Sequence, residues 1–376
     1  MSRSLSRRQR RAAFDESTEA YQGLADRVIA LAPSAGLDVV GIAGVEPFLE
    51  ARAAIHDRKR RGLADTMGFT FTKPERSTEP AETLPGAASL IVAARRYKRV
   101  DELPQAGSAN GRVARYSWID HYEPLRTGLT ILAKELAEVG FRTRVMADDN
   151  SLVDRAAAYR AGIGWLGKNA NLLVPGLGSW FVLGALVTDA KLPPTSNRPV
   201  PDGCGTCVRC IDACPTRAII SPGVVDARRC LAWLVQKPGK FPEEFREALD
   251  DRMYGCDDCQ EVCPPNRTAD RRHLLPPTEP NTEAYISLET LLTGSDAELL
   301  ERHGRFYLPG RDPNILRRNA LLAWGNVAAR PGHRPSRSGS TIVARYLTDN
   351  DPAVRDAAIW AWNRAGLSPE QATRPC

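Results

Sequence analysis

The stretch that decides the fold is CGTCVRCIDACP at residues 204–215, and a related stretch, CDDCQEVCP, follows at residues 256–264. The first has the spacing C-x2-C-x2-C-x3-C-P, in which three thiolates bind one iron–sulfur cubane and the fourth binds a neighbouring cluster. The second places three more cysteines before a proline, and Cys230 stands alone between the two stretches. This pattern predicts two [4Fe-4S] clusters, which transfer single electrons.

The crossing of the fourth cysteine assigns the ligands of each cluster. One cluster takes the first three cysteines of the first stretch and the last cysteine of the second. The other cluster takes the remaining three and, by elimination, the isolated cysteine. The predicted ligands are Cys204, Cys207, Cys210 and Cys263 for one cluster, and Cys214, Cys230, Cys256 and Cys259 for the other.

Zinc is the competing interpretation of these cysteines, because two CxxC pairs are enough to bind it. Zinc explains four of the cysteines, but neither the triple spacing nor the two cysteine–proline endings. A secreted disulfide framework would staple a small domain and would not crowd eight of nine cysteines into one segment of a long chain. We therefore expect the protein to lie in the reducing cytoplasm. We expect Cys376 to be an exposed terminal thiol without a role.

The chain before the cysteines alternates between strand-like and helix-like segments. Short apolar runs predict buried strands, and apolar residues at helical spacing predict amphipathic helices. The predicted strands are residues 37–43, 88–94, 144–147 and 180–187, and the predicted helices are residues 16–31 and 124–139. The alternation predicts an α/β domain over residues 16–195, followed by a cluster-binding domain over residues 196–275.

The two ends of the chain have different patterns. Residues 1–15 are basic, lack the apolar run of a secretory signal, and predict a disordered tail. Residues 276–376 are expected to be helical, with patterns at residues 316–328, 342–346 and 354–362. One or two helical-repeat units and a plain helical cap on the metal-binding domain both explain this region.

Composition and charge narrow the class of protein. Hydrophobic residues make up 43% of the chain and charged residues 26%, as in an ordinary globular protein. No apolar run approaches the ~20 residues that span a membrane. The formal net charge of +6 permits binding to a polyanion such as nucleic acid without requiring it. No GxGxxG follows a predicted strand and no GxxxxGK[ST] loop is present, so the redox centre that two clusters would serve must be held by other means.

Several stretches resemble the epoxyqueuosine reductase family, and the resemblance runs over nearly the whole chain. They are GCDDCQEVCPPN at 255–266, AGIGWLGKN at 161–169, Gly178-Ser179-Trp180, Leu183-Gly184, Ala114-Arg115-Tyr116 and Asp120-His121-Tyr122. The resemblance implies reduction of epoxyqueuosine to queuosine at the wobble position of tRNA, with cobalamin fed by the two clusters. It also implies a nitroreductase-like cobalamin-binding α/β domain, a ferredoxin-like two-cluster domain and an all-α HEAT-like C-terminal region.

The resemblance places the family's proton donor at Asp148, at the end of a predicted strand. Opening an epoxide leaves an alkoxide and then expels an oxygen leaving group, so a positioned acid accelerates the reaction. Such an acid must keep its proton near neutral pH, which burial beside another carboxylate achieves. The family more often has a small residue and a proline after the aspartate, whereas this chain has Asp149, Asn150 and Ser151. Asp149 is therefore an alternative donor, and capping of the following helix is the structural alternative.

The resemblance also implies contacts to cobalamin. The residues that fall where the family lines the corrin are Arg76, Asp148, Lys168, Asn169, Leu172, Ser179, Ala232 and Asp258. After Cys230 the family usually has a serine, a threonine and a glutamate, where this chain has Ala232, Val235 and Lys237. Ordinary packing or turn geometry is the alternative for each of these residues.

Two partners follow from the resemblance, a tRNA anticodon region and an external low-potential electron donor, and we expect a monomer. Candidate tRNA-binding residues are the basic Arg317, Arg318, Lys237 and Lys240 and the aromatic Trp118, Tyr122 and Trp233. A solvated charged face and core packing are the respective alternatives. Two other functions remain open, a dehalogenase-like reductase of a small molecule and an electron carrier without catalysis.

Overall fold

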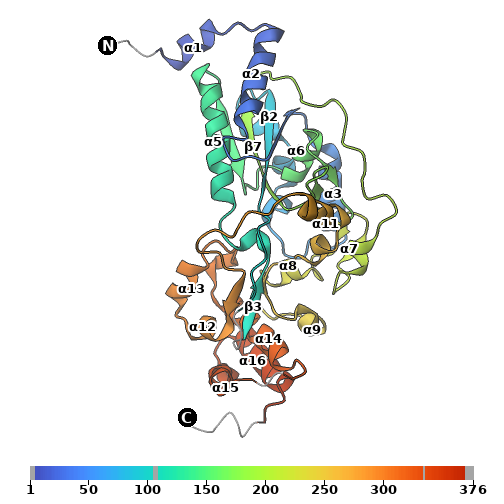
Figure 1. The fold of residues 1–376 in the computed structure, drawn as a ribbon, viewed down its shortest axis with the longest axis vertical. Coiled ribbons are helices and arrows are strands. Elements are labelled where there is room, and N and C mark those ends of the chain that lie inside the picture. Colours follow the sequence, from blue (N-terminus) through green and yellow to red (C-terminus); the bar gives the residue numbers. More distant parts are fainter. Residues whose placement is uncertain (1–4, 105–108, 333–334, 369–376) are drawn as a thin grey trace.

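An antiparallel four-stranded sheet is the centre of the N-terminal half of the molecule (Figure 1). The computed structural model describes residues 5–104, 109–332 and 335–368. The strands are β1 (Val39–Gly44), β2 (Ser89–Arg96), β7 (Phe181–Thr188) and β4 (Thr143–Ala147). They lie in the order β1-β2-β7-β4, and each neighbouring pair is antiparallel.

Helices cover both faces of this sheet. On one face, α2 (Thr18–Leu31) and α5 (Tyr122–Glu138) pack against side chains such as Ile91 and Ala93 of β2. On the other, α6 (Asp154–Arg160) packs against Leu90 and Val92 of the same strand. Successive residues of a strand point to opposite faces, so a strand buried on both faces is a continuous apolar run. The predicted strands and helices of this half are confirmed.

Shorter elements complete the N-terminal half. They are α3 (Leu49–Arg60), α4 (Pro74–Ser77), the two-stranded ribbon β5 (Trp165–Leu166) and β6 (Leu172–Leu173), and the 3-10 turns η1 (Phe69–Phe71), η2 (Pro80–Thr83) and η3 (Arg115–Ser117). Within the described ranges, no helix has both the length and the apolar content needed to cross a bilayer.

The prediction of a disordered N-terminal tail is wrong for part of the tail, because α1 spans Arg7–Ala13. Its N-terminus has a capping box, in which the Ser6 hydroxyl accepts from the Gln9 N–H while the Gln9 side chain accepts from the Ser6 N–H. The Arg11 guanidinium lies 4.0 Å from the ring centroid of Phe141 and 2.7 Å from Glu16. These contacts hold the basic helix against the end of α5.

The cysteine segment is built from short helices and hairpins. Its elements are α7 (Arg209–Asp212), β8 (Ile219–Ser221), β9 (Val224–Val225), α8 (Leu231–Leu234), η4 (Glu243–Phe245), α9 (Arg246–Leu249), α10 (Asp258–Glu261) and α11 (Pro264–Arg272). Figure 1 shows α7, α8 and α11 on one side of the molecule, between the sheet and the C-terminal helices.

A second, three-stranded sheet joins distant parts of the chain. Its central strand β3 (Asn110–Val113) pairs in parallel with β10 (Arg252–Tyr254) and antiparallel with β11 (Tyr285–Ser287). Gly111 permits close packing here, since a Cβ on it would lie 2.7 Å from Leu288 and 2.9 Å from Met253. The sequence did not predict this sheet, which links the N-terminal half, the cysteine segment and the C-terminal region.

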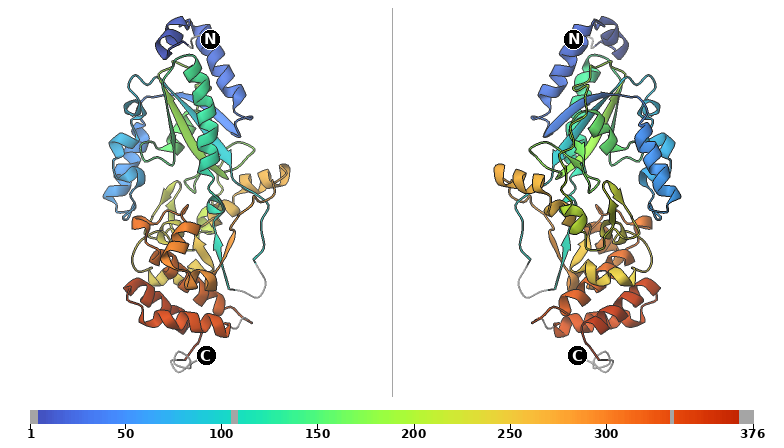
Figure 2. Two further views of the ribbon diagram at one scale, coloured as in Figure 1. Left: turned by 90° about the vertical axis from the view of Figure 1, so that its left-hand side faces the viewer. Right: turned by 90° about the vertical axis from the view of Figure 1, so that its right-hand side faces the viewer.

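The C-terminal region is helical, as predicted. It contains α12 (Leu288–Thr293), α13 (Asp296–Arg302), η5 (Pro309–Arg311), α14 (Asn314–Ala328), α15 (Arg337–Arg345), η6 (Tyr346–Thr348) and α16 (Pro352–Arg364). One hydrophobic core contains Leu231 and Met253 of the cysteine segment together with Leu321 of α14 and Ala358 of α16. The C-terminal helices thus share a core with the cysteine segment, and both views of Figure 2 show the red helices stacked on that end.

The prediction that Arg317 and Arg318 form a tRNA-binding surface is wrong. Arg318 is 1% exposed, and its guanidinium donates to the carbonyl oxygens of Lys237 and Gly239 at 2.6 Å each. The Arg317 side chain is largely covered and forms a 2.6 Å ion pair with Asp296. The arginines sit on a helix that is buried almost all around, so their charges hold neighbouring loops in place.

Candidate metal centre and active site

All eight clustered cysteines are free thiols, and four of them lie at or near the start of a short helix. Cys230 and Cys263 occupy the N-cap positions of α8 and α11, and Cys210 and Cys259 lie in α7 and α10. Backbone N–H groups at a helix start point towards such a position and favour negative charge there. The helix starts in this segment therefore favour the deprotonated, thiolate form of the cysteines that lie there, which is the form that binds metal.

The thiols fall into two groups in space. Burial raises the pKa of the Cys263 thiol to about 11, and negative charge on Cys204, Cys210 and Cys207 adds to the rise. These four are the first predicted ligand set, although they come from both cysteine stretches.

The second group has the remaining four thiols. Burial raises the pKa of Cys259 well above its ordinary value, with further contributions from Cys256 and Cys230 and a smaller one from Cys210 of the first group. Burial likewise raises the pKa of Cys230, and Cys214 contributes to that rise. These electrostatic contacts link Cys214, Cys230, Cys256 and Cys259 to one another and, through Cys210, to the first group.

The donor chemistry of these sites fits iron–sulfur clusters. The Ala218 N–H donates to the Cys214 sulfur at 3.1 Å, the kind of contact that tunes cluster potentials. Across the described residues, no three His, Cys, Asp or Glu side chains converge closely enough to hold a single metal ion. The zinc alternative requires four ligands at about 2.3 Å from one ion.

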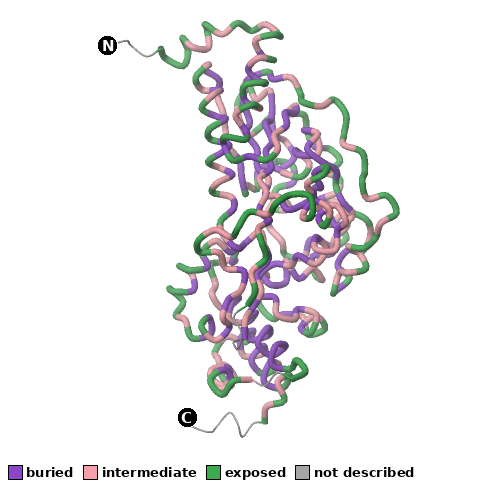
Figure 3. Tube along the Cα trace, in the orientation of Figure 1, coloured by how far each residue is buried: buried purple, intermediate pink, exposed green. Residues whose placement is uncertain are grey.

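The two thiol groups differ in depth. Gly203, Gly205 and Val208, which flank the first thiols, are exposed, and the rim of the molecule around them is green in Figure 3. Gly255 and Asp257, which flank the second thiols, are buried. By these flanking residues we call the first group the outer and the second the inner one; of the thiols themselves, Cys263 of the outer group is buried and the other seven are partly exposed.

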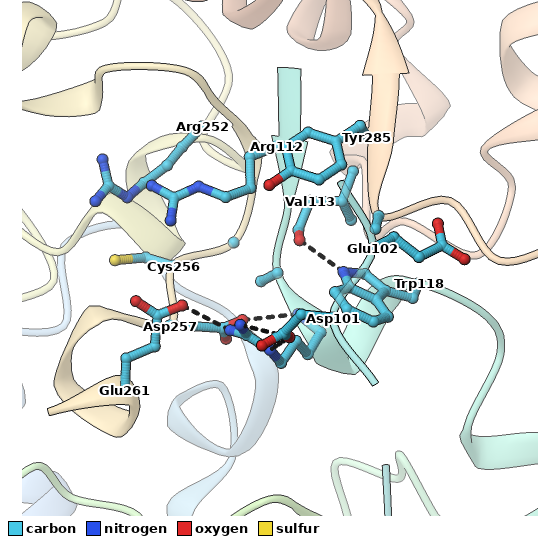
Figure 4. A pocket seen from close by; sticks show the side chains of 14 residues that line it. Asp101, Glu102, Arg112, Val113, Trp118, Arg252, Cys256, Asp257, Glu261 and Tyr285 are labelled. Carbon is cyan, nitrogen blue, oxygen red and sulfur yellow. Dashed lines mark hydrogen bonds and ion pairs between the residues drawn. The ribbon is translucent and has the colours of Figure 1, made fainter. Parts of the chain in front are cut away.

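A buried ion network forms the wall behind Cys256. The Arg115 guanidinium is 2.8 Å from Asp101, 3.2 Å from Asp257 and 2.7 Å from Glu261. Figure 4 shows these carboxylates gathered beside Cys256 in a small pocket that Arg112, Trp118, Arg252 and Tyr285 also line. Although burial opposes it, the three carboxylates raise the pKa of Arg115, so its positive charge stays beside the second thiol group.

Asp148 lies at the end of β4 in a strained conformation. Its φ is 55°, in the left-handed region that non-glycine residues rarely adopt. The residue reaches solvent, yet enough protein surrounds its carboxyl that partial burial raises the pKa, aided by Asp120 and Asp149 and opposed by Arg126. A partly exposed carboxyl with a raised pKa is suited to donate a proton.

The neighbouring Asp149 has a different role. Its carboxylate accepts the Ser151 N–H at 2.8 Å and lies 3.5 Å from the Arg144 guanidinium. Although burial opposes it, these contacts lower the pKa of Asp149. The helix cap of α6 is Val153, with no side-chain hydrogen bond, so Asp148 does not cap that helix. Asp149 shapes the turn, and this favours Asp148 as the acid.

Three phenols and a second carboxyl surround Asp148. Burial raises the pKa of Tyr116 to about 12 and that of Tyr122 and Tyr254 further, and the Asp148 charge contributes to each rise. Burial raises the pKa of Asp154 to about 8, with Arg155 opposing and Asp148 adding, and its buried Oδ1 has no hydrogen-bond partner. All these groups therefore hold protons near neutral pH.

Sequence reasoning missed most of this constellation as a site. Tyr254 and Asp154 carry no local signal, because their role depends on burial created by distant segments. Tyr116 belongs to the Ala114-Arg115-Tyr116 motif, for which the sequence predicted no role. Tyr122 was predicted only to stack on a tRNA base. Tyr122 is the first residue of α5, and the charge of Asp148 adds to the burial that raises its pKa.

Four of the residues predicted to contact cobalamin lie where the α/β half meets the cysteine segment. The Lys168 ammonium donates to the Gly205 carbonyl at 2.6 Å, and the Asn169 amide donates to the Cys259 carbonyl at 3.3 Å. The Ser179 hydroxyl donates to the Gln260 side chain at 2.9 Å. Ala232 follows Cys230, and its N–H points to that sulfur. These residues sit beside the thiol groups.

The other three predicted cobalamin contacts have different settings. Asp258 forms a 2.6 Å ion pair with Arg252, so its charge is already matched. Leu172 is buried in the core between the sheet and α6. Arg76 is exposed on α4, whose Ser77 carbonyl accepts the Val153 N–H at 3.0 Å. That bond attaches α4 to the loop after Asp148, so Arg76 lies on the active-site side of the molecule.

The remaining tRNA candidates are mostly engaged in other contacts. Trp118 and Trp233 are buried, and their indole N–H groups donate to Val113 and Asp65. Lys237 pairs with Asp65 and Lys240 with Asp356. Both tryptophans therefore pack in the core, the alternative that the sequence left open. Cys376 lies outside the described residues.

Two family models match the chain. Residues 203–266 match the "4Fe-4S double cluster binding domain", which excludes the zinc interpretation of this segment. Residues 78–149 match "Epoxyqueuosine reductase QueG, DUF1730", a stretch that ends at the two aspartates after β4.

The chain is similar along nearly its whole length to curated and solved proteins. The epoxyqueuosine reductase of Bacillus cereus is 35% identical over 92% of this chain and 90% of its own, and that of Xanthomonas campestris is 35% identical over 91% and 96%. A crystal structure of epoxyqueuosine reductase with an epoxyqueuosine-modified tRNA-Tyr stem loop superposes with a TM-score of 0.82 at 32% identity, covering 92% of this chain and 91% of that one. The Bacillus subtilis enzyme, in a structure whose catalytic loop has swung out of the active site, gives 0.81 at 31% identity over 92% and 91%.

Proposed function

The chain belongs to the epoxyqueuosine reductase family, and we propose that the site around Asp148 reduces epoxyqueuosine to queuosine at the wobble position of tRNA. The observation that carries this proposal is the combination of a carboxyl at the end of β4, whose pKa is raised by burial, with two adjacent thiol groups that fit [4Fe-4S] clusters. Family relatives of matched length support the substrate.

The reaction needs two electrons and two protons, since an epoxide becomes an alkene and its oxygen leaves as water. Each [4Fe-4S] cluster passes one electron at a time, which suits a two-step supply. We assign Cys204, Cys207, Cys210 and Cys263 to the outer cluster and Cys214, Cys230, Cys256 and Cys259 to the inner one. The grouping of the thiols supports this assignment.

Cobalamin is the cofactor that the family resemblance implies, and the residues at the junction of the two halves fit it. The buried Oδ1 of Asp154 has no hydrogen-bond partner within the described residues, and Asp148 near it is exposed, so polar groups there are available to a ligand. When bound, cobalamin supplies a low-potential centre at the end of the two-cluster path. Lys168, Asn169 and Ser179 would hold it from the α/β side.

We propose that the other predicted cobalamin contacts approach the same cofactor from other elements. Ala232 and Asp258 would approach from the cluster side and Arg76 from α4, with Leu172 as packing beneath. This division follows from where each residue lies relative to the thiols and to the loop after Asp148.

The protein's own contribution to the chemistry is proton supply and exclusion of water. Asp148 holds a proton at its carboxyl and delivers it to the departing oxygen. Asp154 and the phenols of Tyr116 and Tyr122 have raised pKa values, so they also carry protons near neutral pH. A general acid of this kind contributes about 10²–10⁴-fold to rate.

The finer architecture belongs to the proposal as well. We assign residues 16–195 to a nitroreductase-like cobalamin-binding domain, residues 196–275 to a ferredoxin-like two-cluster domain and residues 276–376 to a HEAT-like helical region. The antiparallel sheet covered on both faces and the run of C-terminal helices support the first and last assignments. We propose a cytoplasmic monomer that binds the anticodon region of tRNA and accepts electrons from an external low-potential donor.

The two alternatives from the sequence gain no support. The similar proteins of matched length are epoxyqueuosine reductases, and one carries a modified tRNA stem loop in its structure. A small-molecule reductase and a non-catalytic carrier are therefore not favoured.

A single-turnover assay tests the function. Anaerobically reconstituted protein with cobalamin and dithionite is mixed with tRNA that bears epoxyqueuosine, and the nucleosides are identified by mass spectrometry. We expect queuosine to appear only when cobalamin is added. Protein with full iron and bound cobalamin that forms no queuosine would overturn the proposal.

A further inference from the structure

A row of three aromatic rings runs from the core of the protein to its surface. Tyr307, at the outer end, is 43% exposed and is the one exposed aromatic side chain in the part of the chain that the structure describes. Its ring centroid lies 4.7 Å from that of Phe69, with the two rings tilted by 50°. Phe69 in turn contacts the buried ring of Trp233 edge-on, at 6.3 Å between centroids. We call Trp233, Phe69 and Tyr307 the aromatic row.

The aromatic row joins three distant segments. Phe69 begins η1 between α3 and α4, Trp233 belongs to α8, and Tyr307 belongs to the segment before η5. The loop that leads to η1 is fixed by Asp65, which accepts the Trp233 indole N–H at 2.9 Å and lies 2.8 Å from the Lys237 ammonium. Phe69 has a φ of 48°, a strained value for a bulky residue that persists only where its surroundings hold it. The packing of the two inner rings therefore supports the outer ring.

On one side, the aromatic row adjoins the phenols near Asp148. The Tyr307 N–H donates to the Tyr254 hydroxyl at 2.7 Å, and the Tyr254 ring centroid lies 6.3 Å from that of Tyr116. Burial raises the pKa of Tyr254 and of Tyr116, with a smaller contribution from the charge of Asp148. The backbone of Tyr307 is therefore one hydrogen bond away from a phenol of the proposed active site.

On the other side, the aromatic row is tied to the loop after Asp148. The Ser77 hydroxyl donates at 3.2 Å to the carbonyl of Thr70, the residue that follows the middle ring of the row. The Ser77 carbonyl accepts the Val153 N–H at 3.0 Å, and residues 148–153 form the loop between β4 and α6. Contacts from two sides thus place the aromatic row beside the proposed acid.

The chain around the middle ring is positively charged. Residues 56–76 contain six lysines and arginines but only three aspartates and glutamates. The Lys59 ammonium donates to the Phe71 carbonyl at 2.9 Å, which brings the basic last turn of α3 against the loop. Lys73 and Arg76 are exposed, and neither side chain forms an ion pair within the described ranges. Aromatic rings beside free cations are the arrangement that binds single-stranded nucleic acid.

We propose that Tyr307, supported by Phe69, stacks on the nucleobase next to the wobble nucleotide in the tRNA anticodon loop. This inference rests on the proposed function. Proteins recognise single-stranded RNA loops by stacking unpaired bases on aromatic side chains. The modified wobble base must reach Asp148, whereas Tyr307 is bonded to Tyr254 and lies at the surface. The base that Tyr307 meets is therefore a neighbour of the wobble base, and no bond is made or broken there.

The same features argue against a protein partner at this position. A stable protein interface buries about 800 Å² on each partner, and the centre of such an interface is apolar. The exposed residues of the loop that carries Phe69 are polar, with Thr66, Thr72 and Lys73 among them. One exposed ring beside polar and positive groups matches a base and its phosphates better than an apolar protein surface.

The test measures the affinity of the reconstituted protein for RNA without turnover. An anticodon stem loop that bears epoxyqueuosine is titrated with protein in the absence of a reductant, and the dissociation constant is read by fluorescence anisotropy. Tyr307→Phe keeps the ring, whereas Tyr307→Leu keeps an apolar side chain without a ring. The matched control is Ile359→Ala on α16, because Ile359 is 45% exposed and lies outside the aromatic row.

A second set of stem loops tests whether the ring and one base form the same contact. In these RNAs the base on the 5′ side or on the 3′ side of the wobble nucleotide is replaced by an abasic site. On one of the two sides, loss of the base should weaken binding to the parent protein about tenfold. The same loss should not weaken binding to Tyr307→Leu further, because both changes remove one shared contact.

We expect Tyr307→Leu to bind the intact stem loop about tenfold more weakly than the parent protein, and Tyr307→Phe and Ile359→Ala to bind like the parent. Equal affinity of Tyr307→Leu and the parent would overturn the inference, and so would independent losses at both abasic positions. A Tyr307→Phe variant as weak as Tyr307→Leu would also overturn it, because the hydroxyl would then be the contact. A protein that shows the coupling but forms no queuosine would contradict the proposed function and not this inference.

Discussion

The side-chain oxygen of Asn266 accepts a hydrogen bond from the backbone N–H of Ser179 at 2.6 Å. Asn266 is 1% exposed, and its amide also donates to the Gln260 carbonyl at 2.8 Å. A Cβ on Gly178 would lie 2.1 Å from the same oxygen, so the glycine permits the approach. One buried amide thus ties the loop before β7 to the helix that begins at Cys263.

Replacing this amide should loosen the junction of the two halves. Asn266→Ala leaves the Ser179 N–H without its buried acceptor, a loss of about 1–3 kcal/mol. We expect Asn266→Ala to unfold at a lower urea concentration and to form queuosine more slowly than the parent protein. We expect its iron content to stay at eight atoms per chain. The exposed Asn363→Ala on α16 is the matched control and should leave the midpoint unchanged. Equal midpoints for the two variants would contradict the role of Asn266.

Substitutions at the two adjacent aspartates should have different effects, because Asp148 is proposed to donate a proton and Asp149 holds the turn. In the single-turnover assay, Asp148→Asn should lower the rate at least ~100-fold, because it removes the proton but keeps the shape. Asp149→Asn should retain most of the rate, since its carboxylate holds the turn through Ser151. The parent rate should also decline as pH rises through the raised pKa of Asp148. A larger loss at position 149 than at 148 would reverse the assignment.

The free energy of unfolding should depend on pH because Asp154 binds a proton more tightly in the folded protein than in the unfolded chain. Burial raises the pKa of this carboxyl from 3.8 to about 8. Between these values the folded protein holds a proton that the unfolded chain has released, so the contribution to stability is largest at low pH and is lost as pH rises to about 8. Asp154→Asn cannot lose that proton.

The measurement is the free energy of unfolding in urea for the parent and for Asp154→Asn across pH 5 to 8. We expect the parent to lose stability relative to the variant as pH rises. Ser151→Ala, in the same loop, serves as a control that should follow the parent curve. Parallel curves for the parent and Asp154→Asn would show that the carboxyl titrates normally.

Single cysteine replacements should test the ligand sets. Cys230→Ala removes one ligand of the inner set, and Cys263→Ala removes one of the outer set. Each variant should lose up to about four of the eight iron atoms, because each cubane holds four. Cys376→Ala is the control and should keep the full iron content. A Cys230 variant with all its iron and unchanged electron paramagnetic resonance signals would remove that residue from the ligand set.

Arg318 should matter for stability and not for direct contact with RNA. Its planar guanidinium reaches the carbonyls of Lys237 and Gly239 together, which a lysine ammonium cannot reproduce. We expect Arg318→Lys to lower the free energy of unfolding by about 2 kcal/mol. The affinity of the remaining folded protein for tRNA should be unchanged. Arg345→Lys, an exposed substitution on α15, should alter neither quantity.

The sequence predicted the elements whose signal is local. β2 and β7 were found because burial on both faces leaves an uninterrupted apolar run. The thiol ligands were found because their spacing is dictated by the geometry of a cubane. The acid after β4 was located through family resemblance, and its distinction from Asp149 needed the hydrogen bond to Ser151.

Other features depend on contacts between distant segments and left no local trace. The strands β3, β10 and β11 are three or four residues long, too short to show a period, and they pair across more than a hundred residues. Arg318 has the appearance of a surface charge, and only the loop after α8 makes it a buried donor. Asp154 acquires its high pKa from burial beside Asp148.

The three-stranded sheet has a consequence for how the protein is made. Its strand β10 leads directly into Cys256, and Cys256 packs against the core that the C-terminal helices complete. A ribosome that has released only the first 275 residues has therefore delivered all eight ligands but not the wall that encloses the inner ones. We therefore expect insertion of the inner cluster to follow synthesis of the helices that complete this core. A nascent chain stalled before α14 would present that site open to oxygen.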